Sequence, residues 1–80
     1  MEKSVTSEGY KVLLACLRGA REGAGLTQAE VADRLGLSQS QVSKCERGER
    51  RLDVIELREW CGALGIGLAA FIRTLERRLS

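Results

Sequence analysis

Residues 36–51, GLSQSQVSKCERGERR, concentrate side chains that form hydrogen bonds and carry positive charge. Glutamine can form two hydrogen bonds with the edge of adenine, lysine can donate to guanine, and serine adapts to either partner. Arginine suits the phosphate groups of a nucleic-acid backbone. Within this stretch only Leu37, Val42 and Cys45 are apolar enough for a core position, so most of it is expected to face water.

The excess positive charge of the chain lies in this same stretch. The 80 residues carry 13 Lys and Arg against 11 Asp and Glu, which gives a net charge of +2. Residues 38–51 contain four basic residues and two glutamates, so they account for the whole excess. The total charge is too small to indicate a polyanionic partner, whereas its local distribution favours contact with an anion.

Several classes of site are excluded by what the sequence lacks. It has no histidine, no cysteine with a base within sequence reach, no glycine-rich phosphate loop and no paired catalytic carboxylates. We therefore expect no enzymatic activity and no cofactor. Cys16, Cys45 and Cys61 lack the spacing of a zinc site, and we expect three buried, reduced thiols, although the sequence alone leaves a disulfide open.

The sequence also argues against a membrane or secreted protein. It contains no run of about 18 apolar residues, the length that a transmembrane helix requires. Its first ten residues, MEKSVTSEGY, lack the apolar segment of a signal peptide. A cytoplasmic protein is therefore expected.

Apolar spacing and capping residues predict five helices in a single domain. The absence of proline and the few aromatic residues favour an all-α fold. Helices are expected at about residues 7–23, 28–35, 39–47, 54–64 and 68–78, and residues 1–6 are expected to be frayed. The residues that cap the first four helices are Ser7, Thr27, Ser38 and Asp53, with Glu30 completing a capping box. The inner face of the fourth helix is expected to consist of Val54, Leu57, Trp60, Cys61 and Leu64.

Residues 27–47 meet the requirements of two helices joined by a sharp turn. Ala32 is small where two steeply crossing helices must approach closely, and Gly36 permits the positive φ of a tight turn. The expected inward anchors are Val31, Leu35, Leu37, Val42 and Cys45. These features are those of a helix-turn-helix.

The segment LTQAEVADRLGLSQSQVSKCERGERR resembles the λ repressor/Cro type of helix-turn-helix, the Xre-like family of bacterial and phage regulators. The resemblance extends from about residue 13 to residue 71 and includes the following helix, DVIELREWCGALGI. It implies an all-α, compact five-helix λ-repressor-like DNA-binding domain over residues 7–80, with the helix-turn-helix at about 27–47. In this family the third helix lies in the major groove of DNA, and residues at its start read base edges.

The resemblance assigns roles to individual positions of this chain. By position, the side chains that read bases are Gln39, Ser40 and Lys44, with Ser43 at the margin. The residues that bind phosphates are Gln28 at the start of the second helix, Ser38, and then Arg47, Arg50 and Arg51 after the third helix. The alternative for Arg50 and Arg51 is that they are solvated loop charges.

Glu46 is a negative charge in a region that is expected to face DNA. The resemblance implies that it pairs with an arginine of the first helix, and Arg21 occupies the matching position. We expect a partly buried structural pair, whose loss would leave an uncompensated charge. Cys45 stands where the family usually has a larger apolar residue, so the packing there is expected to be looser unless Trp60 fills the space. Leu52 stands where a proline is common.

The fifth helix is the expected dimer interface. One such domain contacts little DNA, so the family usually binds palindromic operators as a twofold dimer. The residues expected to be shared with a partner chain are Ile72, Leu75 and Leu79, with Leu68 and Phe71 facing inward. The alternative is that the whole stripe covers the domain's own core.

The resemblance therefore implies a sequence-specific transcriptional regulator that binds double-stranded DNA in the major groove. The expected type is a repressor or a restriction-modification controller, acting as a homodimer with no membrane contact and no small-molecule ligand. The alternative is an antitoxin-like or other protein-interaction module on the same fold. Antitoxins of this family often add a disordered or strand-forming tail, which this sequence does not show.

Overall fold

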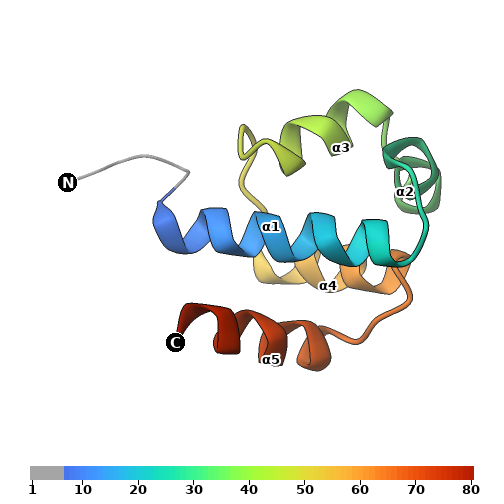
Figure 1. Ribbon diagram of the computed structural model, residues 1–80. Helices are drawn as coiled ribbons and strands as arrows, with labels where there is room; N and C mark the ends of the chain where they lie inside the picture. Colours follow the sequence, from blue (N-terminus) through green and yellow to red (C-terminus); the bar gives the residue numbers. More distant parts are fainter. Residues whose placement is uncertain (1–6) are drawn as a thin grey trace.

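The computed structural model describes residues 7–80, which form five α-helices joined by short turns (Figure 1). The helices are α1 (Glu8–Gly23), α2 (Gln28–Leu35), α3 (Gln39–Glu46), α4 (Val54–Ala63) and α5 (Leu68–Leu79). The all-α prediction is confirmed, and each helix begins and ends within one residue of its expected bounds. The fraying expected for residues 1–6 falls outside the described residues.

Each of the first four helices begins at a side chain that caps it. The capping residues are Ser7, Thr27, Ser38 and Asp53, as the sequence predicts. Each accepts a hydrogen bond from the backbone N–H three residues further on, which is otherwise unpaired in the first turn of a helix. In α2, α3 and α4 the side chain at that third position also accepts a bond from the N–H of the cap. Local side chains thus set where these helices start.

Gly36 sets the angle between α2 and α3. Its φ is 72°, in the left-handed region that other residues rarely adopt. The N–H of Leu37 then donates to the carbonyl of Ala32 at 2.9 Å, which satisfies the last turn of α2. The turn that the sequence predicts at Gly36 is therefore present, and it delivers the chain directly into the Ser38 cap of α3.

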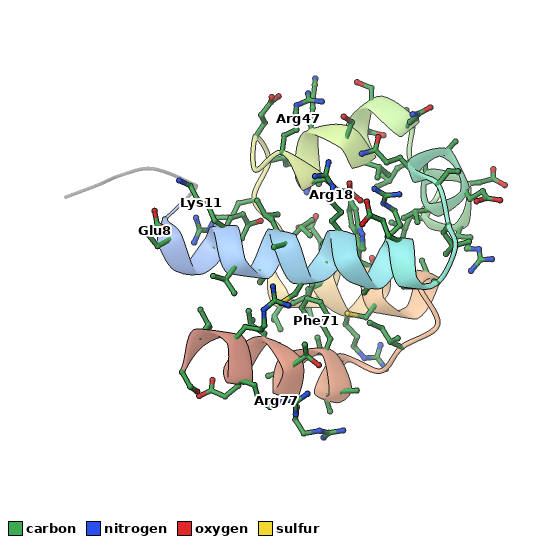
Figure 2. All side chains as sticks on the ribbon, in the orientation of Figure 1. Glu8, Lys11, Arg18, Arg47, Phe71 and Arg77 are labelled. Atoms are coloured by element: carbon green, nitrogen blue, oxygen red, sulfur yellow. The ribbon has the colours of Figure 1, made fainter. Side chains whose placement is uncertain are left out.

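The core lies between α1 and the helices that surround it. Figure 1 shows α1 through the middle of the molecule, α3 along one side, α5 along the other, and α4 behind. Leu17, Val31 and Val42 bring α1, α2 and α3 together with no exposed surface. Phe71 of α5 lies between α5 and α1, and Trp60 adds the largest buried side chain from α4 (Figure 2). The three cysteines are buried and unpaired, as predicted.

Two residues expected in the core lie at the surface instead. Val54 is 61% exposed because it is the first residue of α4, in a turn that extends beyond the core. The buried face of α4 consists of Leu57, Trp60 and Cys61. Leu37 is also exposed, since it lies in the turn between α2 and α3 rather than on a helix face.

Candidate nucleic-acid interface

α3 presents polar side chains to solvent and is anchored from behind by apolar ones. Val42 and Cys45 are buried against the core. The side chains predicted to read bases lie on the other side of the helix: Gln39, Ser40 and Lys44 are exposed, and Ser43 is half-buried. Figure 1 shows α3 along the edge of the molecule, on the side of α1 opposite α5. An exposed helix with hydrogen-bonding side chains along one face suits the width of a major groove.

Ser38 fixes the start of α3 and therefore the direction of its first side chains. Its Oγ accepts a hydrogen bond from the N–H of Gln41 at 3.1 Å, and its N–H donates to Oε1 of Gln41 at 2.9 Å. The hydroxyl hydrogen of Ser38 can still donate, because accepting a bond uses only the oxygen lone pairs. Ser38 can therefore cap α3 and still donate its hydroxyl hydrogen to a DNA phosphate, as the sequence predicts.

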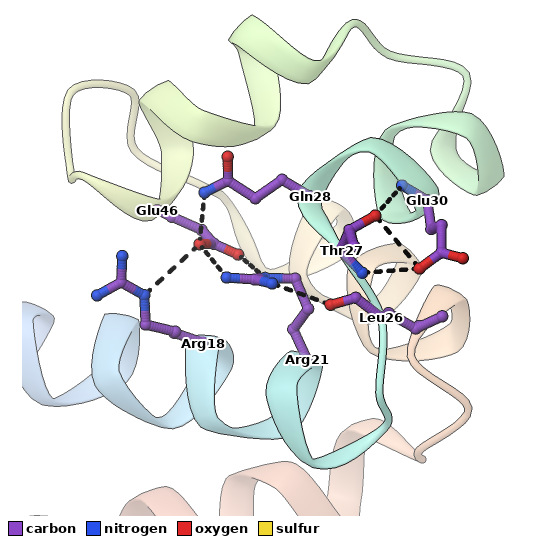
Figure 3. Close-up of polar contacts among 7 residues, drawn as sticks. All are labelled: Arg18, Arg21, Leu26, Thr27, Gln28, Glu30 and Glu46. Atoms are coloured by element: carbon purple, nitrogen blue, oxygen red, sulfur yellow. Dashed lines mark hydrogen bonds and ion pairs between the residues drawn. The ribbon is translucent and has the colours of Figure 1, made fainter.

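Glu46, the last residue of α3, is bound by side chains from α1 and α2 (Figure 3). Arg21 donates through Nε to Oε2 at 2.6 Å and through Nη2 to Oε1 at 3.1 Å. Gln28 donates through Nε2 to Oε1 at 2.9 Å. Arg18 completes the group, with its Nε 3.8 Å from Oε1. We call these four residues the Glu46 cluster, and they join the first three helices at one carboxylate.

The Glu46 cluster is largely shielded from water. The side chain of Glu46 is 1% exposed and that of Arg21 is 11% exposed. Arg21 also donates through Nη1 to the carbonyl of Leu26 at 2.9 Å, which ties the loop before α2 to the same guanidinium. The hydrogen bond to Glu46 raises the pKa of Arg21 against the opposing effect of burial. The structure thus contains the partly buried Arg21–Glu46 pair that the resemblance to the Xre-like family implies.

Two members of the cluster differ from expectation. Gln28, predicted to bind phosphate, directs its amide nitrogen to Glu46, so its side-chain carbonyl and its backbone remain for other contacts. Arg18 was not among the predicted site residues. It lies on α1 beside α3 (Figure 2), and its side chain is 60% exposed. Its spacing of one helical turn from Arg21 is the pattern that places it on the same face.

Arg47 projects from the end of α3, away from α1 and α5 (Figure 2). It donates to Glu49 through Nε at 2.8 Å and through Nη2 at 3.3 Å, and also to the hydroxyl of Ser43. The guanidinium lowers the pKa of Glu49. Arg47, predicted to bind phosphate, is therefore hydrogen-bonded to Ser43, which is predicted to lie at the margin of the base-reading residues.

The other two predicted phosphate-binding arginines also contact neighbouring side chains. Arg50 donates through Nη2 to Oε2 of Glu56 at 2.6 Å, and this bond lowers the pKa of the Glu56 carboxyl. Arg51 lies over the ring of Tyr10, with 4.4 Å between its Cζ and the ring centroid. The hydroxyl of Tyr10 accepts a bond from the N–H of Leu52 at 3.0 Å, so the loop after α3 is fastened to the start of α1.

The described residues contain neither a candidate metal site nor a candidate membrane-spanning helix. Residues 7–80 contain no group of three or more His, Cys, Asp or Glu side chains that could hold a metal ion. No helix in this part of the chain is long and apolar enough to cross a membrane.

The sequence of this chain matches a protein family and a curated protein. The model of a protein family described as "Helix-turn-helix" matches residues 17–71. A curated protein of Sinorhizobium fredii, the uncharacterized HTH-type transcriptional regulator y4dJ, is 50% identical over 46 residues. That match covers 58% of this chain, and it spans 60% of the length of the curated relative.

Solved structures share nearly the whole fold. An XRE-family like protein from Pseudomonas syringae pv. tomato has a TM-score of 0.83 and 47% identity, covering 90% of this chain and 88% of its own. The restriction-modification controller protein C.Esp1396I, solved as a tetramer in complex with its natural 35 base-pair operator, has a TM-score of 0.81. It is 22% identical, covers 89% of this chain and 93% of its own, and shows the fold alone.

Proposed function

This chain belongs to the helix-turn-helix family, and from that premise we propose that it is a transcriptional regulator that binds specific sequences of double-stranded DNA. We propose the repressor or restriction-modification controller type. The observation that carries the proposal is α3 itself, whose exposed Gln39, Ser40 and Lys44 share one face while Val42 and Cys45 hold the other. A rigid helix with this division of faces is what direct readout of a major groove requires.

In this proposal α3 enters the groove and its side chains contact base edges. Gln39 and Ser40 lie in the first turn, directly after the Ser38 cap, and Lys44 lies one turn later on the same face. The Glu46 cluster supports this role because it fixes the end of α3 to α1 and α2. A helix held at both ends can present the same donors and acceptors to every DNA site.

Phosphate contacts then flank α3 on both sides. Gln28 and Ser38 lie at the starts of α2 and α3, where backbone N–H groups favour an anion. Arg47, Arg50 and Arg51 follow α3, and the exposed Arg18 adds a further cation beside it. Arg47 and Arg50 are bound to Glu49 and Glu56 in the structure, so DNA phosphate would replace these carboxylates.

We propose that the regulator acts as a twofold dimer through α5. Ile72 is 39% exposed and Leu79 is 48% exposed, and their spacing of seven residues places both on one face of α5. Leu75 is half-buried and packs against the core, so it contributes less free surface than the other two. A twofold dimer would place two copies of α3 on successive major grooves of a palindromic operator.

Selection of binding sites from random double-stranded DNA tests this function. We expect an enriched, palindromic consensus whose half-sites are separated by about one helical turn. The Gln39→Ala chain serves as the matched control, because it should enrich a degenerate version of the same consensus. A pool that stays random after repeated rounds with the unaltered chain would contradict sequence-specific binding.

A further inference from the structure

Arg18 lies close to Glu46 without forming a hydrogen bond to it. Its Nε is 3.8 Å from Oε1 of Glu46, which is beyond the range of a hydrogen bond. Figure 3 shows the terminal nitrogens of Arg18 on the side away from the carboxylate. The side chain is 60% exposed, so it can change its direction without disturbing the packing of the core. Arg18 is therefore held beside the Glu46 cluster by charge, within reach of a closer contact.

Oε1 of Glu46 is occupied by two other donors. It accepts from Nη2 of Arg21 at 3.1 Å and from Nε2 of Gln28 at 2.9 Å. A carboxylate oxygen has two lone pairs, so these two bonds account for both of them. Arg18 can form a full hydrogen bond to Oε1 only when one of the two donors leaves.

Gln28 is the donor that DNA can remove. Its side chain is joined to the cluster by one bond, whereas Arg21 also donates to Oε2 and to the carbonyl of Leu26. Gln28 is the first residue of α2, where we propose that a DNA phosphate binds. If a phosphate and Glu46 both accepted from Nε2 of Gln28, the two anions would lie within about 6 Å of each other and repel. Binding of phosphate by this amide therefore favours its release from Glu46.

We propose that Arg18 replaces Gln28 at Oε1 of Glu46 when the amide of Gln28 turns to a DNA phosphate. The inference rests on the proposed function. Arg18 is then a positioning residue: it does not contact DNA, and it supplies the donor that the carboxylate loses. The side chain of Glu46 is 1% exposed, and a shielded carboxylate without its partners is strongly unfavourable. The exchange thus lets Gln28 bind phosphate while the end of α3 stays fastened.

Removal of Gln28 reproduces the release of its amide in the absence of DNA. In the unaltered chain Arg18→Ala should lower the urea midpoint only slightly, because the side chain is exposed and not hydrogen-bonded to Glu46. In Gln28→Ala the same substitution should lower the midpoint by about twice as much or more, because Arg18 has become a partner of Oε1. Lys11→Ala is the matched control: Lys11 is a 58% exposed cation of α1, 3.6 Å from Glu8, and its loss should have equal effects in both backgrounds. Equal effects of Arg18→Ala in both backgrounds would overturn the proposal.

Binding to a selected operator distinguishes positioning from direct contact with phosphate. Arg18→Ala should weaken binding about three- to tenfold, the size of a coupling between neighbouring residues. The slope of log K against log salt concentration should change much less than in Arg47→Ala, which removes a proposed phosphate contact. Arg18→Lys keeps a cation that can donate to Oε1, so it should retain more affinity than Arg18→Ala. A slope that becomes shallower by about one unit in Arg18→Ala would assign Arg18 to phosphate and overturn the proposal.

The proposed function and the exchange at Glu46 fail in different measurements. If the chain selects no operator, the proposed function fails, while the urea midpoints still decide whether Arg18 can replace Gln28 at Glu46. If an operator is selected but the effects of Arg18→Ala and Gln28→Ala on the midpoint are additive, the function stands and the exchange is wrong.

Discussion

Arg21 of α1 and Glu46 of α3 form a two-bond ion pair in which the carboxylate is almost completely shielded from water. A negative charge at the end of a DNA-facing helix would repel phosphate if it were exposed. Here the carboxylate instead fastens α3 to α1 and, through Gln28, to α2. The orientation of the proposed recognition helix therefore depends on a contact that makes no use of DNA.

Removal of Arg21 should destabilise the fold strongly. Arg21→Ala leaves the shielded carboxylate of Glu46 with weaker partners, and we expect a loss of about 3 kcal/mol in the free energy of unfolding. Urea denaturation followed by circular dichroism measures this loss. Arg18→Ala is the matched control: its side chain is 60% exposed, and we expect a loss below about 1 kcal/mol. Similar losses in the two variants would show that Glu46 does not depend on Arg21.

Substitution of the base-reading side chains should reduce specificity rather than general affinity. Gln39→Ala and Lys44→Ala each remove a side chain proposed to read a base, and we expect a loss of about 1–3 kcal/mol on the selected operator. Binding to random DNA should change much less. Fluorescence anisotropy with operator, single-base variants and random duplex distinguishes these effects. Equal losses on operator and random DNA would assign both residues to the backbone instead.

Substitution of Arg47 should weaken binding to every sequence. The side chain projects from the end of α3, away from α1 (Figure 2). Arg47→Ala removes a cation that we propose contacts DNA phosphate. The slope of log K against log salt concentration should become shallower by about one unit. Titrations at several salt concentrations on operator and random DNA give this slope. An unchanged slope would remove Arg47 from the phosphate contacts.

Glu49 should compete with DNA for Arg47. Glu49→Gln removes the carboxylate that Arg47 contacts at 2.8 Å, so we expect binding to all DNA to strengthen about two- to fivefold. Glu59→Gln, an exposed glutamate on α4, is the matched control for the change in net charge.

The competition also predicts a pH dependence. Arg47 lowers the pKa of Glu49 in the free protein, and loss of Arg47 to phosphate would return that pKa towards its ordinary value. Binding then takes up protons, so affinity should rise as the pH falls through the range between the lowered pKa and the ordinary value of 4.5. Glu49→Gln should lack this part of the pH profile. A profile unaffected by the substitution would contradict the competition.

The dimer interface is best tested at its exposed residues. Ile72→Glu and Leu79→Glu place a charge on the apolar surface of α5 and should give a folded monomer in sedimentation velocity. Leu75→Glu is less informative, because Leu75 also packs against the core and its substitution should lower stability as well. Operator affinity should fall in both exposed variants. A dimer that persists in Ile72→Glu and Leu79→Glu would place the interface on another surface.

The positions of the helices were predictable from the sequence, because capping residues and turn glycines affect only the residues next to them in the chain. Ser38 and Gly36 set the start of α3 and the turn before it, and both were identifiable from their side chains alone. The convergence of Gln28 and Arg18 on Glu46 was not identifiable in this way, since it depends on how three helices pack. Val54 illustrates the same limit: its periodicity matches the buried face of α4, but the core ends before it.

The ion pairs Arg47–Glu49 and Arg50–Glu56 were only partly predictable from the sequence. Glu49 is two residues from Arg47 in a turn, so charge pattern alone could have indicated that contact. Glu56 was identifiable as a cap partner of Asp53, whereas its bond to Arg50 depends on the path of the loop into α4. A cavity of about 140 Å³ beside Cys45 and Trp60 depends on side-chain volumes from α2, α3, α4 and the segments that join them, and only the small size of Cys45 indicated it in advance.

The most direct measurement is the map of backbone amide shifts when the nitrogen-labelled chain is titrated with its selected operator. Readout through α3 predicts the largest shifts at Gln39, Ser40 and Lys44, with further shifts at the phosphate-binding arginines after α3. A duplex of the same length with scrambled sequence should reproduce the arginine shifts but not the shifts in the first turn of α3. Shifts centred on another helix, or identical maps for operator and scrambled duplex, would contradict sequence-specific binding through α3.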